Sequence, residues 1–409
     1  MVALGTGGIK ANVGPFGAQQ VQDLGAEAVQ IYFNWFYWFV NAGGLISYCA
    51  IAYVQQNVGF SWGFLIPLLS MLMALVFLNV ARKYYIYKDG QGSPLGSVLG
   101  ICSSGLCQQS PYIDGRRQVF DSARREFGGR YSSEMVDGVI AILCMLPVFF
   151  FMIMFWAIYS QMQSTYFLQG ERMDLSVNDF IIPVAFLNAF NTVAVLVTIP
   201  VLDRLVYPCF RKMGRPLTYL QRIGVGFILS TLSVCVAGVL EIYRKKHLGF
   251  HQKVGTETFF ASKVTVFLQA PQFVLVGAAE AFTSIAGYEF AYTQAPKSLQ
   301  SCIVGVFLAT SGIGNYFSTA ILAIVEKVTR DDPWFPDDIN DGKAEFVFFL
   351  FGGLMVCFFI GYLPVAGWYR YQKYITDSEV KVRQSRSRSH DDDNQSVQEE
   401  HSSFSNSYC

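Results

Sequence analysis

Long apolar runs separated by short polar segments dominate this sequence. The runs have lengths near or above the roughly 20 residues that an α-helix needs to cross a bilayer. They lie at residues 31–53, 62–80, 136–160, 179–206, 217–240, 263–293, 299–326 and 344–369. A shorter run that contains Lys10 opens the chain and reads as the inner part of a further spanning helix. The pattern therefore predicts an all-α membrane protein with eight full spans and one partial span.

The apolar run at residues 273–296 carries two carboxylates, Glu280 and Glu289, well inside its ends. An acid on a spanning helix costs roughly 2.5–3.5 kcal/mol on insertion scales, so by default it faces a wet cavity or a partner. Ser284 follows Glu280 by one turn and shares its face, whereas Glu289 is nine residues on and points the other way. We expect Glu280 to line a cavity and Glu289 to lie against a neighbouring helix or near the inner mouth. The alternative is that each acid only satisfies a buried hydroxyl or a basic side chain.

Other polar side chains fall within the apolar runs or at their ends. Trp156 and Gln161 lie where the run at residues 136–160 ends, and aromatic side chains there either anchor the helix or line a cavity. Asn191 lies inside the next run, and buried amides need partners across helices or in a ligand. An acid, amides, aromatics and a lysine around one midplane cavity can bind a zwitterion by its two ends. These features predict a solute carrier, and its ionisable groups allow coupling to a pH gradient.

Composition and charge narrow the class of protein. The chain has 409 residues, 52% hydrophobic and 15% charged, which is apolar and charge-poor for a soluble domain. Its 30 basic and 30 acidic residues balance, so no net field favours a nucleic-acid partner. Nine cysteines lack the pattern of a disulfide framework or a zinc site. The chain has no phosphate loop, nucleophile elbow, HExxH motif or pair of aspartates at membrane depth, so we expect neither an enzyme nor a cofactor beyond a proton gradient.

The charges between the runs predict an orientation in the membrane. The long basic loop at residues 82–135 is expected in the cytoplasm, and the acidic connection at residues 327–343 on the outer side. The polar segment at residues 371–409 reads as a disordered cytoplasmic tail. One basic segment disagrees, because the alternation of spans places it outside: Arg244, Lys245, Lys246 and Lys253. We follow the alternation, because the other loops agree with it.

Four segments resemble the proton-coupled oligopeptide transporter (POT) family of the major facilitator superfamily: GTGGIKANVGPFGAQQ, FNWFYWFVNAGGLISY, FWAIYSQMQSTYFLQ and AAEAFTSIAGYEFAYTQAPKSLQS. QMQSTYFLQ and IPVLDRLVYP look most like its peptide/histidine transporter branch. The resemblance implies a symporter that uses protons to move di- and tripeptides, and in this branch histidine, into the cytosol by alternating access. It also implies a multi-pass protein of endosomal or lysosomal membranes, with the plasma membrane as the alternative.

The resemblance assigns roles to the polar residues at membrane depth. It implies that Glu280 receives the amino group of the peptide and takes part in proton coupling, with Asn191 assisting it. Lys10 matches a lysine tied to the substrate carboxylate and to proton coupling. Trp156 matches an aromatic side chain that lines the pocket, and Ser284 lies beside Glu280.

Three further positions are implied in gating or packing. Asn41 matches a family asparagine that serves helix packing, and Glu289 belongs to a run that leads toward the inner gate. Gln161, at the end of its apolar run, is assigned to the same group. Ser160 stands where some peptide carriers place an acid, so a gate that depends on that charge is not expected here.

The sequence also departs from the family pattern. Members have twelve helices and an ExxER motif in the first one, and this chain has no such motif. We expect that helices one to three and part of helix four are missing. Residues 1–81 would then be a remnant of the N-terminal lobe, residues 82–135 the inter-lobe loop and residues 136–370 a complete six-helix C-terminal lobe. The alternative function is that of a shortened, non-transporting product that acts as a membrane scaffold or regulator.

Overall fold

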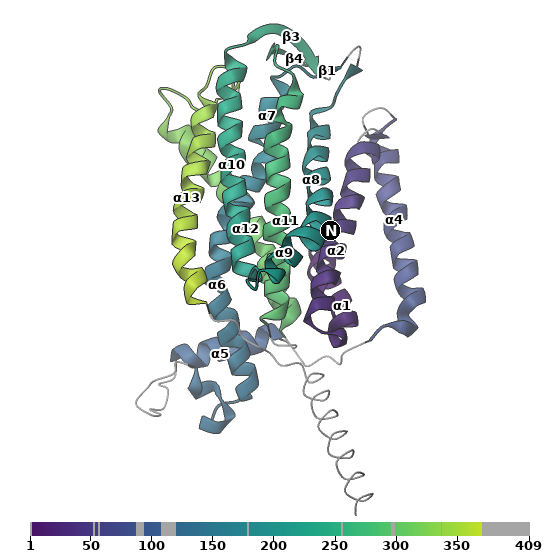
Figure 1. The fold of residues 1–409 in the computed structure, drawn as a ribbon, viewed down its shortest axis with the longest axis vertical. Helices are drawn as coiled ribbons and strands as arrows, with labels where there is room; N and C mark the ends of the chain where they lie inside the picture. The colour runs from purple at the N-terminus through teal and green to yellow at the C-terminus, as the bar shows by residue number, and fades with distance from the viewer. Residues whose placement is uncertain are drawn as a thin grey trace, which may run out of the picture.

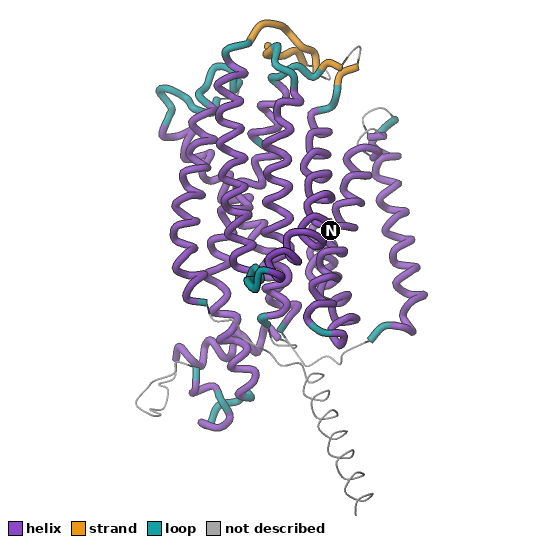
Figure 2. Tube along the Cα trace, in the orientation of Figure 1, coloured by secondary structure: helices purple, strands orange, loops and turns teal. Residues whose placement is uncertain are grey.

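The described part of the chain is a bundle of long helices that run side by side (Figures 1 and 2). The computed structural model describes residues 2–51, 54–55, 58–86, 94–107, 120–177, 180–254, 257–295, 299–336 and 338–369. The predicted tail at residues 371–409 lies outside these ranges. Among the described residues, seven helical segments are long and apolar enough to cross a membrane. The predicted all-α membrane fold is therefore confirmed.

Three long helices form the N-terminal part of the chain: α1 (Val2–Val21), α2 (Ala26–Ile46) and α4 (Phe60–Val80). The chain turns between α1 and α2 at Gly25, whose φ of 102° favours glycine. The described part of the span expected at residues 31–53 forms α2 and a short π-helix. It is not among the seven segments, because Trp, Tyr and Asn side chains lower its mean hydropathy. α4 lies apart from the bundle, and none of its most apolar window is buried (Figure 1).

The predicted inter-lobe loop contains a compact helical element at one end of the bundle (Figure 1). It consists of α5 (Pro94–Cys107) and two 3-10 helices, Asp121–Ala123 and Arg125–Phe127. Arg124 donates to the carboxylates of Asp121, at 2.9 Å, and of Asp137 on the following helix. These contacts, the hydrogen bond to Asp137 first, raise the pKa of the Arg124 guanidinium. They connect this element to the first turns of the helix that begins at Ser133.

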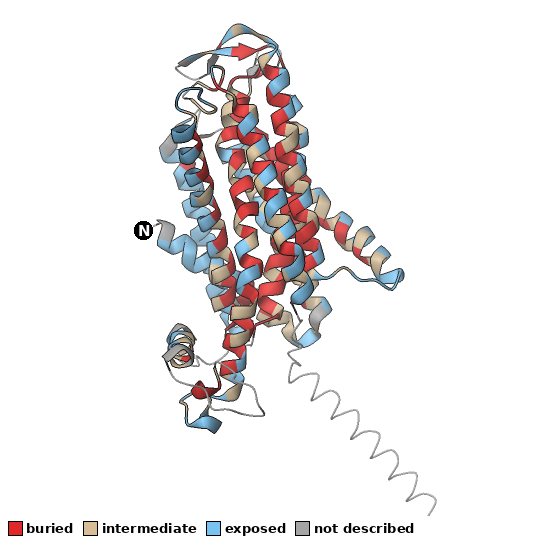
Figure 3. Ribbon diagram, turned by 90° about the vertical axis from the view of Figure 1, so that its left-hand side faces the viewer, coloured by how far each residue is buried: buried red, intermediate tan, exposed pale blue. Residues whose placement is uncertain are grey.

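The remaining helices form the main bundle: α6 (Ser133–Tyr159), α7 (Thr165–Glu171), α8 (Asn188–Val201), α9 (Tyr207–Lys212), α10 (Tyr219–Lys245), α11 (Ala270–Thr293), α12 (Gln300–Val328) and α13 (Ala344–Trp368). α11 is central, since it packs against α2, α8, α10 and α12. Most of its side chains are buried, and buried residues line the inner faces of the bundle (Figure 3). A polar side chain on α11 is therefore surrounded by protein.

Two antiparallel hairpins lie at the end of the bundle opposite α5 (Figure 1). Their strands are β1 (Ser176–Val177), β2 (Phe180–Ile181), β3 (Leu248–Val254) and β4 (Glu257–Ser262), with Ser176 opposite Ile181 and His251 opposite Phe260. The predicted span at residues 179–206 was wrong at its start, because β2 precedes Pro183 and the helix begins only at Asn188. A residue before proline is biased toward extended backbone, which delays the helix.

The start of the span predicted at residues 263–293 also differs from the structure. α11 begins at Ala270, after a short 3-10 helix, with Pro271 in its first turn. Proline suits that turn, because its missing N–H has no partner within the helix there. The apolar pattern located the helix, and the proline marks where it begins.

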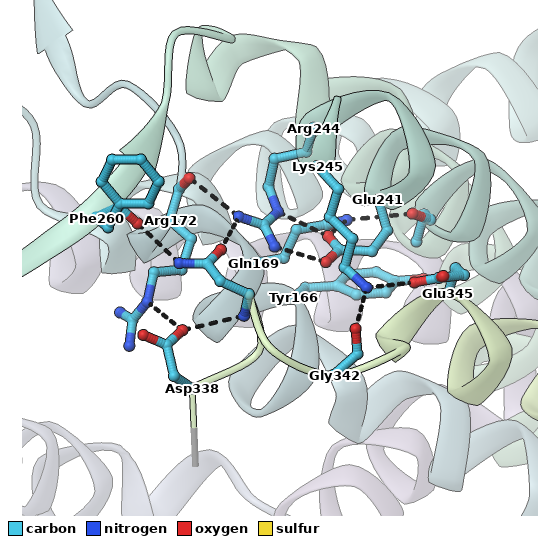
Figure 4. Close-up of polar contacts among 12 residues, drawn as sticks. Tyr166, Gln169, Arg172, Glu241, Arg244, Lys245, Phe260, Asp338, Gly342 and Glu345 are labelled. Carbon is cyan, nitrogen blue, oxygen red and sulfur yellow. Dashed lines mark hydrogen bonds and ion pairs between the residues drawn. The ribbon is translucent and has the colours of Figure 1, made fainter. Parts of the chain in front are cut away.

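Two of the basic side chains at the end of α10, Arg244 and Lys245, pair with acids inside the protein (Figure 4). Arg244 donates to both carboxylate oxygens of Glu241, at 2.7 and 2.9 Å, and both side chains are fully buried. Lys245 pairs with Glu345 at 2.7 Å. Asn340, in the acidic connection, accepts from Arg244 and donates to the Phe260 carbonyl. The segment after α10 and the acidic connection therefore share one end of the bundle, as alternation requires. The paired Arg244 and Lys245 do not act as a topology signal, whereas Lys246 is exposed.

Candidate functional site

The Glu280 carboxylate lies at the meeting point of four helices. The hydroxyl of Tyr37 on α2 donates to Oε1 at 2.5 Å, and Nδ2 of Asn191 on α8 donates to Oε2 at 3.2 Å. The hydroxyl of Tyr159, at the end of α6, faces the same carboxylate. Glu280 is only 5% exposed. A buried acid is thus surrounded by neutral hydrogen-bond donors and has no cationic partner among the described residues.

Close packing of α8 against α11 brings Asn191 to this carboxylate. Gly277 precedes Glu280 by nearly one turn, and a Cβ atom there would lie 2.5 Å from the Asn191 carbonyl oxygen and 2.9 Å from Oδ1. Real Cβ atoms do not approach that closely, so only glycine permits this helix spacing. The site therefore depends on the absence of a side chain at position 277.

Gly277→Ala tests this dependence. The added methyl group must push α8 away from α11, and overpacking of this kind costs about 1–3 kcal/mol. We expect a lower melting temperature of the purified protein, together with weaker binding of any ligand held by Glu280. Gly353→Ala on α13 is the matched control, because a Cβ there meets nothing within 4 Å. Equal melting temperatures for the two variants would contradict the packing argument.

Two buried polar atoms near Glu280 have no hydrogen-bond partner among the described residues: Asn191 Oδ1 and Ser284 Oγ. Trp156 Nε1, on α6, is likewise buried and unpaired. Trp156 stacks edge to face on Tyr159, with ring centroids 5.4 Å apart. An unpaired buried polar group costs about 1–3 kcal/mol, so such groups mark places where a ligand gains hydrogen bonds. A carboxylate with a free amide oxygen and a hydroxyl beside it is suited to an ammonium group.

Lys10 does not meet Glu280 in this structure. It lies exposed on α1, and among the described residues it forms no ion pair. One turn later, Gly14 lies in van der Waals range of Phe33 and Tyr288, where α1 meets α2 and α11. Lys10 therefore shares a face of α1 with Gly14, without contacting the Glu280 site.

Glu289 lies against the neighbouring helix, where it pairs with a basic side chain, as the alternative reading of this acid had it. Arg222 of α10 donates to its carboxylate at 3.1 Å, and the two side chains are 8% and 2% exposed. The guanidinium lies 4.0 Å from the ring centroid of Tyr207. Gln30 of α2, with its amide oxygen turned toward α10, accepts from Arg222 at 3.1 Å. This buried pair therefore connects α2, α9, α10 and α11.

Asn41 and Gln161 serve helix geometry in different ways. Asn41 donates to the Tyr37 carbonyl at 3.0 Å, one turn back within α2, so its contact is local. Gln161 donates to the Ser318 hydroxyl of α12 at 2.6 Å and accepts from Thr165 at 3.0 Å. Gln161 thus adds a buried hydrogen bond between the end of α6 and α12.

Tyr37 and Arg222 take part in these contacts, and neither was predicted from the sequence as a site residue. Tyr37 stands among many aromatic side chains, where nothing separates a ligand-binding tyrosine from one that packs. Its position one turn before Asn41 on α2 was the only available signal. Arg222 was recognisable as a lone arginine just inside an apolar run, four residues after the helix-capping Thr218. Among the described residues, no cluster of His, Cys, Asp and Glu could hold a metal.

Comparison with known proteins identifies a family. A family model described as the POT family matches residues 1–339. The chain is 33% identical over 423 residues to protein NRT1/PTR family 8.1 of Arabidopsis thaliana, covering 92% of this chain and 74% of that protein. It is 30% identical over 412 residues to solute carrier family 15 member 3 of Rattus norvegicus, covering 93% and 70%.

A solved structure has the same arrangement of helices. The crystal structure of the POT family transporter PepTSo superposes with a TM-score of 0.67 at 23% identity. The match covers 89% of this chain and 76% of that one. At this level of identity, the similarity concerns the fold.

Proposed function

Because this chain belongs to the POT family, we propose that it is a proton-coupled symporter of di- and tripeptides, with histidine as a further substrate. The observation that carries the proposal is the buried Glu280 carboxylate, surrounded by hydroxyl and amide donors from three other helices. The ammonium group of a peptide supplies the positive charge that this acid lacks among the described residues.

Two groups account for the coupling to protons. A carboxylate that is buried without a cation is stabilised either by a proton or by a bound ammonium group. Proton binding and peptide binding at Glu280 are thereby linked. Lys10, which shares a face of α1 with Gly14, is proposed to attract the peptide carboxylate. A free carboxylate and a free amino group are also present in histidine, which supports it as a substrate.

The division into lobes belongs to the same proposal. Helices α1, α2 and α4 belong to one lobe and helices α6 to α13 to the other, with residues 82–135 between them. α2 contacts the second lobe through Tyr37 and through Trp38, whose indole donates to the Leu196 carbonyl at 3.1 Å. These contacts must change if the lobes move during alternating access. We place the protein in endosomal or lysosomal membranes, with the plasma membrane as the alternative.

The direct test is transport by the purified 409-residue chain in proteoliposomes. With an acidic exterior, radiolabelled Ala-Ala should accumulate, and a protonophore should abolish the accumulation. Proteoliposomes without protein give the background. Accumulation at background level, in a preparation that also fails to bind Ala-Ala, would overturn the proposal. Binding without accumulation would favour the alternative of a non-transporting scaffold or regulator.

A further inference from the structure

A polar cavity lies between the end of α6 and the middle of α12. Its volume is about 310 Å³, at the lower end of the range of small-molecule pockets. Eight of its nine lining residues carry a hydroxyl or amide group, and none carries a charge. On α12 the lining includes Ser311, Asn315, Ser318 and Leu322, whose spacing places them on one helix face. The cavity is therefore lined by neutral hydrogen-bonding groups.

The walls of this cavity are held in place. Gln161 and Ser318 join the two helices by a buried hydrogen bond of 2.6 Å. One turn before Ser318, Gly314 allows α12 to approach α6 so closely that a Cβ atom would lie 2.4 Å from the Trp156 Cβ. A pre-formed cavity binds a ligand without first being ordered, which favours affinity.

Several lining groups are available to a ligand. Gln163, Ser311 and Asn315 form no side-chain hydrogen bond with the rest of the described chain, although each lines the cavity. Uncharged polar groups satisfy a neutral amide or hydroxyl as well as water does. They do not replace the hydration of a charged group, because no counter-ion stands among them.

Tyr159 joins the cavity to the candidate site. Its hydroxyl faces Glu280, and the same residue lines the cavity. A peptide whose amino group pairs with Glu280 has its first side chain within a few bonds of that amino group. This side chain therefore lies close to Tyr159, which also lines the cavity.

We propose that the α6–α12 cavity binds the side chain of the amino-terminal residue of the peptide and selects uncharged polar side chains over charged ones. The inference rests on the proposed function, because it needs the amino group at Glu280. It goes further in naming a determinant of substrate choice.

The test is competition between unlabelled dipeptides and labelled Ala-Ala for the purified chain. Ser-Ala and Asn-Ala should compete about three- to tenfold better than Asp-Ala and Lys-Ala, the gain expected from one or two hydrogen bonds. The variants Asn315→Leu and Ser311→Ala should reduce that ratio. Asn315→Asp places a negative charge in the cavity and should shift the preference toward Lys-Ala. Ser301→Ala, on the exposed side of α12, is the control for Ser311→Ala.

The outcomes distinguish failure of the proposed function from failure of the cavity proposal alone. If labelled Ala-Ala does not bind to the unaltered chain, the proposed function fails and the cavity proposal fails with it. If Ala-Ala binds but charged and neutral dipeptides compete equally, only the cavity proposal is overturned. The same holds if the Asn315→Asp variant keeps the original order of preference. Melting temperatures confirm that each variant is folded before its ratio is interpreted.

Discussion

Glu280→Gln is expected to weaken dipeptide binding about 10- to 100-fold and to abolish uptake driven by a proton gradient. The substitution removes the charge that pairs with the peptide ammonium group, and a hydrogen bond to a charged group contributes about 1.5–3 kcal/mol. The amide oxygen of the glutamine can still accept from Asn191 Nδ2, which donates to the carboxylate at 3.2 Å, so the change removes the charge and keeps this hydrogen bond. The measurement is binding and pH-driven uptake of Ala-Ala in proteoliposomes.

The control for this variant is Glu326→Gln, the same change at an exposed position on α12. It should leave the affinity and the uptake at the level of the unaltered chain. If Glu280→Gln behaves like the control, Glu280 does not receive the amino group, and the pairing with Tyr37 and Asn191 is structural. Preserved binding with lost pH dependence would instead assign Glu280 to the proton alone.

Arg244→Met is expected to destabilise the protein by about 3–5 kcal/mol. It leaves Glu241, a fully buried carboxylate, with Gln169 as its remaining donor at 2.9 Å. Removing one partner of a buried ion pair has a cost of this size, because the other charge stays buried without compensation. The contacts of Arg244 to Asn340 and to the Arg172 carbonyl are also lost. The measurement is the melting temperature, with the free energy of unfolding from denaturant titration.

Two further variants separate the buried charge from loss of packing. The double variant Arg244→Met with Glu241→Leu should regain much of the stability, since apolar residues often replace a buried pair at little cost. Arg215→Met makes the same change at an exposed position and should have a small effect. A double variant no more stable than Arg244→Met would show that the hydrogen bonds to the loops, rather than the ion pair, stabilise this end of the bundle.

The two buried ion pairs of the bundle lie in different surroundings. Glu241 and Arg244 are both on α10, and their remaining side-chain partners are Gln169 of α7 and Asn340 of the acidic connection (Figure 4). Glu289 and Arg222 instead lie where α2 meets the main bundle, and Gln30 of α2 shares the contact. Under the proposed function, only the second pair lies at a boundary between moving parts.

The sequence by itself determined the class of the protein and the position of most helices. Every spanning helix needs about 20 apolar residues to cross a bilayer. Each such run can be recognised in the sequence independently of the other segments. For the same reason Glu280 could be singled out, because an acid in such a run is costly wherever the helix packs. The start of the helix after Pro183 was not predicted correctly, because the apolar run begins before the proline and the helix begins after it.

The partners of the buried charges were decided by the tertiary structure. Tyr37 and Glu280 are 243 residues apart in the sequence, Asn191 and Glu280 are 89 apart, and Arg222 and Glu289 are 67 apart. No periodicity along one helix specifies which residue of another helix it meets. That choice depends on the helix packing as a whole, including close approaches such as the one at Gly277. The sequence thus located the acid, and the packing of α2, α6 and α8 around α11 determined its surroundings.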